Sequence, residues 1–130
     1  MIIKFIVWLK KYISISLFIG TAFFCCNQSA TIESNDAIML LNNDDYYFLD
    51  VRTLKEHENI SIPSTDCIPV QEIEERMDEL NDYRDKKIIV YCRSGNRSGI
   101  ATKILSENGF NALNMIGGMN GWKGKVEKEN

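Results

Sequence analysis

The chain has 130 residues, 45% of them apolar, and a formal net charge of −3. This length and composition allow one globular domain and little more. All acidic residues lie after position 26, so the remainder is more negative than the whole chain. This charge excludes nucleic acid as an expected partner and favours solubility outside a membrane.

The first 26 residues are predicted to be an export signal or membrane anchor. Three lysines precede an uncharged apolar run over 13–24, which ends at Cys25-Cys26. The run is shorter than the roughly 20 residues of a standard membrane span, and it suits the apolar region of an export signal. A cysteine after such a run resembles a bacterial lipoprotein signal. We therefore expect Cys26 to be a lipid anchor in the bacterial cell envelope, periplasmic or on its outer face, with an uncleaved anchor as the alternative.

The remaining chain is divided by composition. Residues 27–35 are rich in Ser, Asn and Thr and are predicted to be a polar tether, 36–124 a folded domain, and 125–130 a polar tail. Helices are expected at 36–41 with Ser34 as N-cap, 53–58, 71–80 and 97–108. Strands are expected at 46–49, 67–68, 87–91 and 112–115.

The helix patterns also predict which side chains are buried. Ile73, Met77 and Leu80 share one face of the helix over 71–80. The helix over 97–108 is expected to bury Ile100, Ile104 and Leu105, and to stop at Gly109.

Strands that alternate with helices indicate an α/β fold, with a small parallel sheet and helices on both faces. In such a sheet, ligands bind beyond the carboxyl ends of the strands. Cys92 follows the apolar strand 87–91 directly, so the sequence places this thiol where a site forms.

The loop after this strand is the strongest functional signal in the chain. It reads Cys-Arg-Ser-Gly-Asn-Arg-Ser over 92–98 and leads directly into a predicted helix. Backbone N–H groups of such a loop converge with the positive end of the helix dipole where a sulfur anion would lie. This setting lowers the pKa of a thiol, and the two arginines add positive charge for an anionic substrate. We interpret the loop as an anion cradle around a nucleophilic Cys92.

The same loop resembles the active-site loop of single-domain rhodaneses, which are thiosulfate and persulfide sulfurtransferases. Three other segments occur in the family's order: Leu49-Asp50-Val51-Arg52 with Glu56 following, Ile68-Pro69, and Gly117-Gly118-Met119 with Trp122. The resemblance runs from about residue 36 to 122 and implies a rhodanese-like fold that needs no cofactor.

One segment departs from the family pattern. The chain has Ile-Ser-Ile-Pro-Ser-Thr over 60–65, where rhodaneses usually carry Gly-His-Ile-Pro-Gly-Ala. The loss of both glycines puts the local turn geometry in doubt, because Ile60 and Ser64 resist backbone angles that glycine permits.

The length of the cysteine loop separates two related chemistries. Four residues lie between Cys92 and Arg97, whereas phosphatases and arsenate reductases with this general architecture have five. The resemblance therefore favours a persulfide sulfur over a tetrahedral phosphate as the group that the loop holds.

The resemblance implies a two-step sulfur transfer through a Cys92 persulfide. The substrate-binding residues would be Arg93, Ser94, Gly95, Asn96, Arg97 and Ser98. Arg93 is expected at the entrance and Arg97 where the loop closes, while Ser94 and Ser98 are candidate donors to the persulfide. The implied partners are a small anionic sulfur donor and a thiol acceptor, and we expect a monomer.

Other polar residues are interpreted as structural. Asp50 and Arg52 are expected to form a buried ion pair, and His57 to be a surface or loop residue. Cysteine and histidine spacing gives no zinc motif, so no metal is predicted. Cys67 is read as a small core residue, with a second possibility that it forms a disulfide with Cys92. That possibility keeps an alternative function open, a non-catalytic or thiol-redox module that binds a partner.

Overall fold

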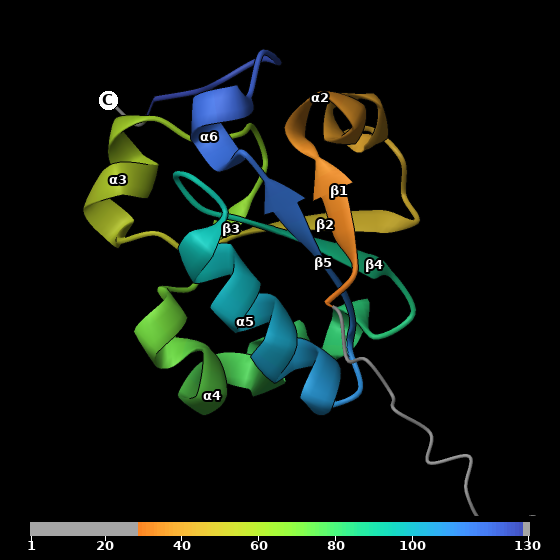
Figure 1. The fold of residues 1–130 in the computed structure, drawn as a ribbon. Coiled ribbons are helices and arrows are strands. Elements are labelled where there is room, and N and C mark those ends of the chain that lie inside the picture. Colours follow the sequence, from red (N-terminus) through yellow and green to blue (C-terminus); the bar gives the residue numbers. More distant parts are fainter. Residues whose placement is uncertain (1–28, 129–130) are drawn as a thin grey trace, which may run out of the picture.

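A five-stranded parallel sheet forms the centre of the molecule, with strand order β1-β5-β4-β2-β3 (Figure 1). The structure is a computed structural model and describes residues 29–128; the predicted export signal and Cys26 lie outside them. Within 29–128, no helix has the length and apolar character needed to cross a membrane. The strands are β1 (Thr31–Glu33), β2 (Tyr46–Asp50), β3 (Asp66–Cys67), β4 (Lys87–Tyr91) and β5 (Asn111–Ile116).

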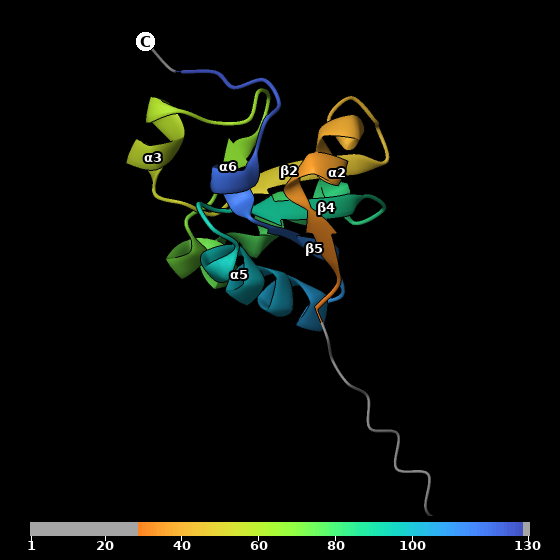
Figure 2. The same cartoon turned by 45° about the horizontal axis from the view of Figure 1, so that its top comes forward.

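Helices cover both faces of this sheet, which confirms the predicted α/β fold (Figure 2). Helices α4 (Ile73–Arg76) and α5 (Asn96–Glu107) pack on one face, and α2 (Ser34–Ala37) and α6 (Gly118–Gly121) lie over the other. Successive strand residues alternate between the faces. The buried core therefore divides into two clusters, one containing Leu49, Val90 and Leu105, the other Phe48, Ile89, Met115 and Trp122.

The segment predicted to be a polar tether contains the edge strand β1. Thr31–Glu33 pairs in parallel with β5, and only Ile32 turns an apolar side chain toward the core. One apolar residue among polar neighbours gives too little pattern to predict a strand. The expected N-cap role of Ser34 is also wrong, because Glu33 occupies that position. Ser34 is buried, and its hydroxyl lies 2.7 Å from the Ile116 carbonyl oxygen and 3.1 Å from that of Gly118.

The predicted helix over 71–80 is broken into three short pieces. A 3₁₀ turn, η2 (Val70–Glu72), leads into α4, and a second 3₁₀ segment, η3 (Met77–Tyr83), follows. The predicted apolar face is correct at Ile73 and Leu80, which are buried. The polar sequence Asp-Glu-Leu-Asn-Asp within η3 explains the irregular geometry, because Asp and Asn compete for backbone hydrogen bonds and are poor helix formers.

Helix α5 forms as predicted to within one residue, but its buried face differs from the expected one. Ile100 is 58% exposed, so the prediction of its burial is wrong. The buried residues are Ser98, Ala101, Thr102 and Leu105, at spacings of three and four. Leu105 is buried and Ile104 packs against the same cluster, as predicted, while small and polar side chains take the other buried positions of the helix.

Two further short elements and a contact of the C-terminal segment complete the fold. Helix α3 (Leu54–Asn59) begins with a capping box, in which the Thr53 hydroxyl and the Glu56 carboxylate bond to each other's backbone N–H groups. A short 3₁₀ turn, η1 (Ile38–Leu40), continues α2. Glu127, in the predicted polar tail, forms an antiparallel bridge with Ser61, so that part of the tail is held against the domain.

Candidate active site

The Cys92 thiol lies at the carboxyl end of β4, at the mouth of the loop that leads into α5. Its side chain is 1% exposed. The backbone N–H of Gly95 donates to Sγ at 3.1 Å, and the Ser98 hydroxyl lies 3.4 Å from Sγ. The sulfur therefore sits in the ring of donors that the sequence predicted.

Backbone geometry at Gly95 forms this ring. Gly95 has φ of +104° and is the N-cap of α5, so the loop turns through a left-handed conformation that favours glycine. Burial alone raises the pKa of the Cys92 thiol, but the Ser98 hydroxyl and the backbone N–H groups of Ser98, Gly95 and Ser94 outweigh it. The net result is a pKa below the usual value for cysteine, which favours the reactive thiolate.

Helix α6 supports the loop from its other side. The backbone N–H of Met119 donates to the Cys92 carbonyl at 2.9 Å, and that of Asn120 donates to the Arg93 carbonyl at 3.0 Å. Gly118 lies so close to the backbone of the cysteine loop that a Cβ at this position would be 2.4 Å from the Cys92 carbonyl oxygen. The Gly117-Gly118 pair identified in the sequence thus lets the C-terminal turn pack against the active loop.

Arg97 is held by an acidic partner from α3. Its guanidinium forms a bidentate ion pair with Glu56, at 2.8 and 2.9 Å. The Arg97 hydrogen bonds lower the pKa of Glu56 to about 2, against the opposing effect of burial. Arg97 therefore closes the loop by joining α5 to α3, with part of its charge balanced by a carboxylate.

Arg93 lies on the surface of the cysteine loop, and its expected role at an entrance to Cys92 stays a prediction. Its side chain is exposed and lines a pocket of about 300 Å³ together with Arg52, Glu56, Asn59, Ile60, Met119 and Asn120. Ser94 and Asn96 are also exposed, on the solvent side of the loop. Among the described residues, no ion pair is formed by Arg93, so its charge is available to an anion in this pocket.

The predicted ion pair of Asp50 and Arg52 is present and buried. Arg52 Nη2 lies 2.6 Å from Asp50 Oδ2 and also donates to the Ile60 carbonyl at 2.7 Å. The expectation that His57 is a surface or loop residue is wrong: it lies on α3, is partly buried, and its Nδ1 is 2.9 Å from Asp50 Oδ2. Asp50 therefore connects β2 with α3, and its partner Arg52 makes the contact with the segment after α3.

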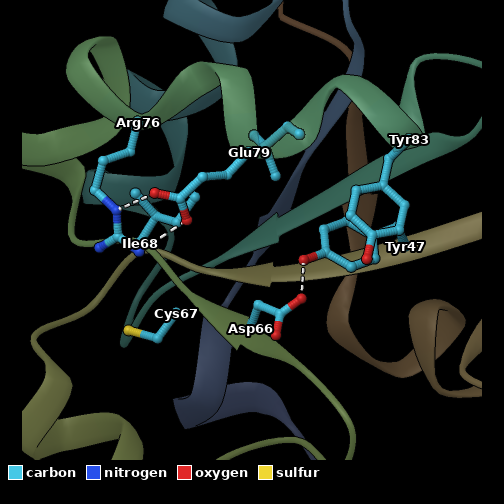
Figure 3. Close-up of a pocket in the computed structure, with 8 residues that line it drawn as sticks. Tyr47, Asp66, Cys67, Ile68, Arg76, Glu79 and Tyr83 are labelled. Carbon is cyan, nitrogen blue, oxygen red and sulfur yellow. Dashed lines mark hydrogen bonds and ion pairs between the residues drawn. The ribbon is translucent and has the colours of Figure 1, made fainter.

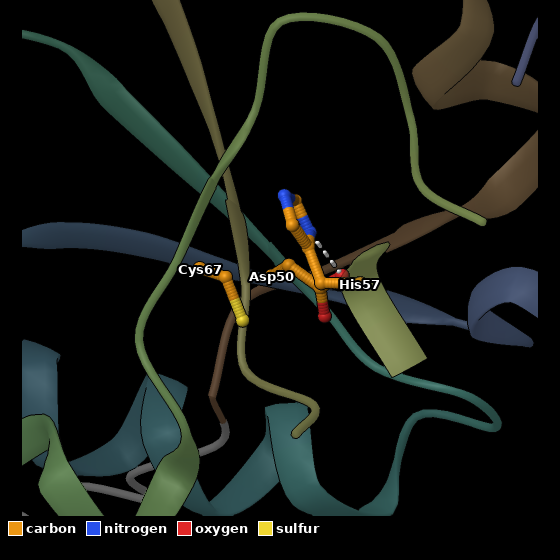
Figure 4. A group of neighbouring side chains, drawn as sticks. All are labelled: Asp50, His57 and Cys67. Carbon is orange, nitrogen blue, oxygen red and sulfur yellow. Dashed lines mark hydrogen bonds and ion pairs between the residues drawn. The ribbon is translucent and has the colours of Figure 1, made fainter. Parts of the chain in front are cut away.

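Asp50, His57 and Cys67 form a compact group that has the residue types of a metal site (Figure 4). Their potential ligand atoms lie within 4.8 Å of one another. The Asp50 carboxylate, however, is already bound by the guanidinium of Arg52. Burial raises the pKa of the Cys67 thiol to about 12, so this group stays protonated. The Asp50 carboxylate, the His57 Nδ1 and the Cys67 thiol thus all take part in hydrogen bonds, and we assign no metal to this group.

Cys67 is half-buried at the sheet edge, where we expected a core position. It lines a second pocket, of about 270 Å³, with residues of β2, β3, α4 and η3 (Figure 3). The rings of Tyr47 and Tyr83 stack at one side of this pocket, with centroids 3.6 Å apart. Its charged groups are paired with neighbours, Arg76 with Glu79 among them. The pocket offers little to hold an ionic ligand.

The segment over 60–65 shows how the chain forms its turn without the family's glycines. Ile60 has an extended backbone, with φ of −164°, which any residue adopts. Ser64 has φ of +59° and is the one non-glycine residue within 29–128 in the left-handed region. Its backbone N–H donates to the Glu127 carboxylate at 3.1 Å. The doubt raised by the sequence therefore concerns Ser64 alone.

The match to a known family extends over this whole arrangement. The profile of the Rhodanese-like domain matches residues 33–125. The chain belongs to the rhodanese-like domain family. Its relatives include proteins named as sulfurtransferases. The cysteine loop, the α6 turn and the Asp50–Arg52 pair all lie within the matched residues.

Two curated relatives come from Bacillus subtilis. The putative sulfurtransferase YtwF is 36% identical over 88 residues, which cover 68% of this chain and 84% of YtwF. The putative sulfur carrier protein YrkF is 37% identical over 87 residues, and the match spans 66% of this chain but only 46% of YrkF. A rhodanese-related protein from Thermoplasma volcanium has a similar solved structure. Its TM-score is 0.69 at 34% identity, covering 75% of this chain and 97% of that one.

Two residues near the rhodanese-like loop were missed as functional candidates. Asn114 of β5 accepts a hydrogen bond from the Ser98 hydroxyl at 2.6 Å and donates from Nδ2 to the Gly95 carbonyl at 3.1 Å. An asparagine inside a strand is unusual, and that signal was available. Glu56 was noted only as part of the family pattern, although its spacing from Thr53 predicts a capping box.

Proposed function

We propose that this protein is a sulfurtransferase that moves sulfane sulfur from thiosulfate, or a similar anionic donor, to a thiol acceptor through a Cys92 persulfide. The observation that carries the proposal is the Cys92 sulfur within a ring of donors in a rhodanese-like loop. The Gly95 N–H and the Ser98 hydroxyl both reach this sulfur. Such a ring stabilises a sulfur anion, which both steps of the reaction require.

The first step is attack of the Cys92 thiolate on the outer sulfur of thiosulfate. A new S–S bond forms, and the bond between that sulfur and the sulfonate sulfur breaks, with its electron pair leaving on sulfite. The resulting cysteine persulfide carries one negative charge. Arg93, which lines the pocket of about 300 Å³, supports this step, because an unpaired guanidinium attracts an anionic donor.

In the second step, an acceptor thiolate attacks the outer sulfur of the persulfide. The acceptor gains the sulfur as its own persulfide, and the Cys92 thiolate returns. The two steps balance without an oxidant or a reductant. The donors around Cys92 lower the pKa of its thiol and so favour the thiolate, which reduces the need for a general base.

The proposal is tested by thiosulfate-dependent sulfur transfer by the purified chain, either to cyanide, which forms thiocyanate, or to a thiol, which forms a persulfide. We expect Cys92→Ser to abolish the activity and the matched variant Cys67→Ser to retain it. Mass spectrometry after treatment with thiosulfate should show one added sulfur atom on the Cys92 peptide. Equal activity in the Cys92→Ser variant and the unmodified protein would refute sulfur transfer through Cys92.

We further propose that the protein acts in the bacterial cell envelope as a monomer attached to the membrane through Cys26. Support comes from the lysines, the apolar run and the cysteine that follows it in the first 26 residues. Labelling of cells with a palmitate analogue should mark the protein and fail to mark Cys26→Ala. Labelling of both proteins alike would contradict the lipid anchor.

A further inference from the structure

Ser98 has one hydroxyl hydrogen and two acceptors within reach. Its side chain is fully buried on the first turns of α5. Its Oγ lies 2.6 Å from Asn114 Oδ1 and 3.4 Å from Cys92 Sγ. A serine hydroxyl donates only one hydrogen bond. The shorter distance is typical of a strong O–H···O bond, so the hydrogen points to Asn114 while Cys92 is a neutral thiol.

The orientation of the Asn114 amide is fixed by a second contact. Its Nδ2 donates to the Gly95 carbonyl at 3.1 Å, and that carbonyl can only accept. A reversed amide would place Oδ1 against the carbonyl oxygen of Gly95, with two acceptors facing each other. Asn114 therefore presents an acceptor, and no donor, to the Ser98 hydroxyl.

We propose that Asn114 is a positioning residue that holds the Ser98 hydrogen while Cys92 is neutral and gives it up when the cysteine sulfur becomes an anion. The inference rests on the proposed sulfur transfer. A neutral thiol can donate its own hydrogen to Ser98 Oγ, whereas a thiolate needs a donor. After the outer sulfur is bound, the negative charge moves to that atom, and the Ser98 hydrogen can return to Asn114.

This competition has a measurable consequence. Removal of the Asn114 acceptor leaves the Ser98 hydroxyl free to donate to Cys92 in every state, which stabilises the thiolate. A purely structural role for Asn114 predicts the opposite result. Loss of the contact with the Gly95 carbonyl would loosen the loop, weaken the Gly95 N–H donor and raise the pKa of the cysteine.

The charged groups around the loop are unchanged by substitutions at these two positions. They are Arg93 in the loop, Arg97 of α5, Glu56 of α3, Asp50 at the end of β2, and Arg52 two residues after it. A difference between variants therefore reports on the Ser98 hydrogen and on the backbone of the loop.

The test is the pH dependence of alkylation of Cys92 by iodoacetamide in the full chain, followed by peptide mapping. We expect Asn114→Ala to lower the pKa of Cys92 by about 0.5 to 1, and Asn114→Leu, which keeps the side-chain volume, to do the same. Ser98→Ala should raise it, and the double variant Ser98→Ala/Asn114→Ala should match Ser98→Ala alone. Asn111→Ala, exposed on the same strand, is the matched control and should leave the pKa unchanged.

A raised pKa in both Asn114 variants, or additive effects in the double variant, would overturn the proposal. Alkylation uses no sulfur donor, so this outcome is separate from the outcome for sulfur transfer. If Cys92 takes up no sulfur from thiosulfate while the Asn114 variants show the expected shift, the positioning role stands and only the sulfurtransferase proposal fails.

Discussion

Glu56 of α3 and Arg97 of α5 are joined by two short hydrogen bonds, at 2.8 and 2.9 Å, although 41 residues separate them in the chain. The same carboxylate accepts from the backbone N–H of Thr53 at 3.0 Å and so caps α3. One side chain therefore fixes the start of a helix and the arginine that closes the active loop. Any change at Glu56 affects both.

We predict that Glu56→Gln lowers the free energy of unfolding at neutral pH. The free energy of unfolding of this variant should also decrease less in acid than that of the unmodified protein. The pKa of Glu56 is about 2 in the folded protein, below its value of roughly 4.3 in an unfolded chain. The ionised carboxylate thus stabilises the fold above about pH 4.5, and this contribution disappears as the pH falls toward 2. Both side chains are about a third exposed, at 31% and 32%, so screening limits the effect to about 1 kcal/mol.

Urea unfolding at steps between pH 7 and pH 2 measures this contribution. Glu74→Gln, an exposed glutamate on α4, is the control and should follow the unmodified protein. Parallel pH curves for Glu56→Gln and the unmodified protein would show that the ion pair with Arg97 contributes nothing to stability.

We predict that Gly118→Ala is far more damaging than Gly109→Ala. Both glycines have positive φ, so both variants share the strain of a left-handed alanine, about 1 kcal/mol. Only at Gly118 would the new Cβ also collide with backbone, 2.4 Å from the Cys92 carbonyl oxygen. At Gly109 the nearest atom, Arg84 Nη1, is 3.7 Å away. The midpoint temperature of thermal unfolding and the rate of sulfur transfer should both fall steeply for Gly118→Ala. Gly109→Ala should keep its activity.

Much of the fold could be predicted because its signals are local. The apolar run of β4, the glycine in the cysteine loop and the Thr53-x-x-Glu56 spacing each specify an element without reference to distant residues. The edge strand β1 could not be predicted in this way. It exists through backbone pairing with β5, a partner 83 residues away at the Thr31–Asn114 pair, and its own side chains carry almost no pattern.

In the candidate site too, the features set by local sequence could be predicted, and the contacts between distant elements could not. The position of Cys92 and the cradle follow from strand, loop and helix in immediate succession. The contacts of Asn114 and His57 do not, because each depends on how separate elements meet in space. His57 follows Glu56 on α3, and only the approach of α3 to the end of β2 places its ring against Asp50. The spacing of residues in the sequence does not predict how α3 packs against the end of β2.

We predict that Thr102→Val stabilises the protein by about 1 kcal/mol. Thr102 is fully buried in α5, and its Oγ1 is the one buried side-chain polar atom within 29–128 that has no hydrogen-bond partner. A buried unpaired hydroxyl costs about 1 to 3 kcal/mol, and valine has the same shape without it. Thr102→Ser is the control: it keeps the hydroxyl, loses a methyl group and should destabilise. Unfolding in urea measures both, and a loss of stability in Thr102→Val would reveal a hidden partner for Oγ1.

Cys67 and Cys92 are separated by an intervening strand. Asp50 of β2 pairs with Cys67 on one side and with Tyr91, the residue before Cys92, on the other. Adjacent strands lie about 4.8 Å apart, so the backbones at Cys67 and Tyr91 are about 10 Å apart. A disulfide needs Cα atoms within about 7 Å. The possibility of a Cys67–Cys92 disulfide would therefore require the backbone to move.

We predict that oxidation by diamide produces no Cys67–Cys92 disulfide, and that Cys67→Ser leaves the alkylation rate of Cys92 unchanged. The physical reason is twofold. The strand of Asp50 lies between the two backbones. The pKa of Cys67, about 12, also leaves its thiol protonated and unreactive at neutral pH, because the thiolate is the form that attacks a disulfide or an oxidised sulfur. Mass spectrometry of a non-reduced digest checks the prediction directly. A peptide linked through Cys67 and Cys92 would favour the thiol-redox function over sulfur transfer, whereas alkylation confined to Cys92 at neutral pH agrees with a single reactive thiol in the part of the chain described by the structure.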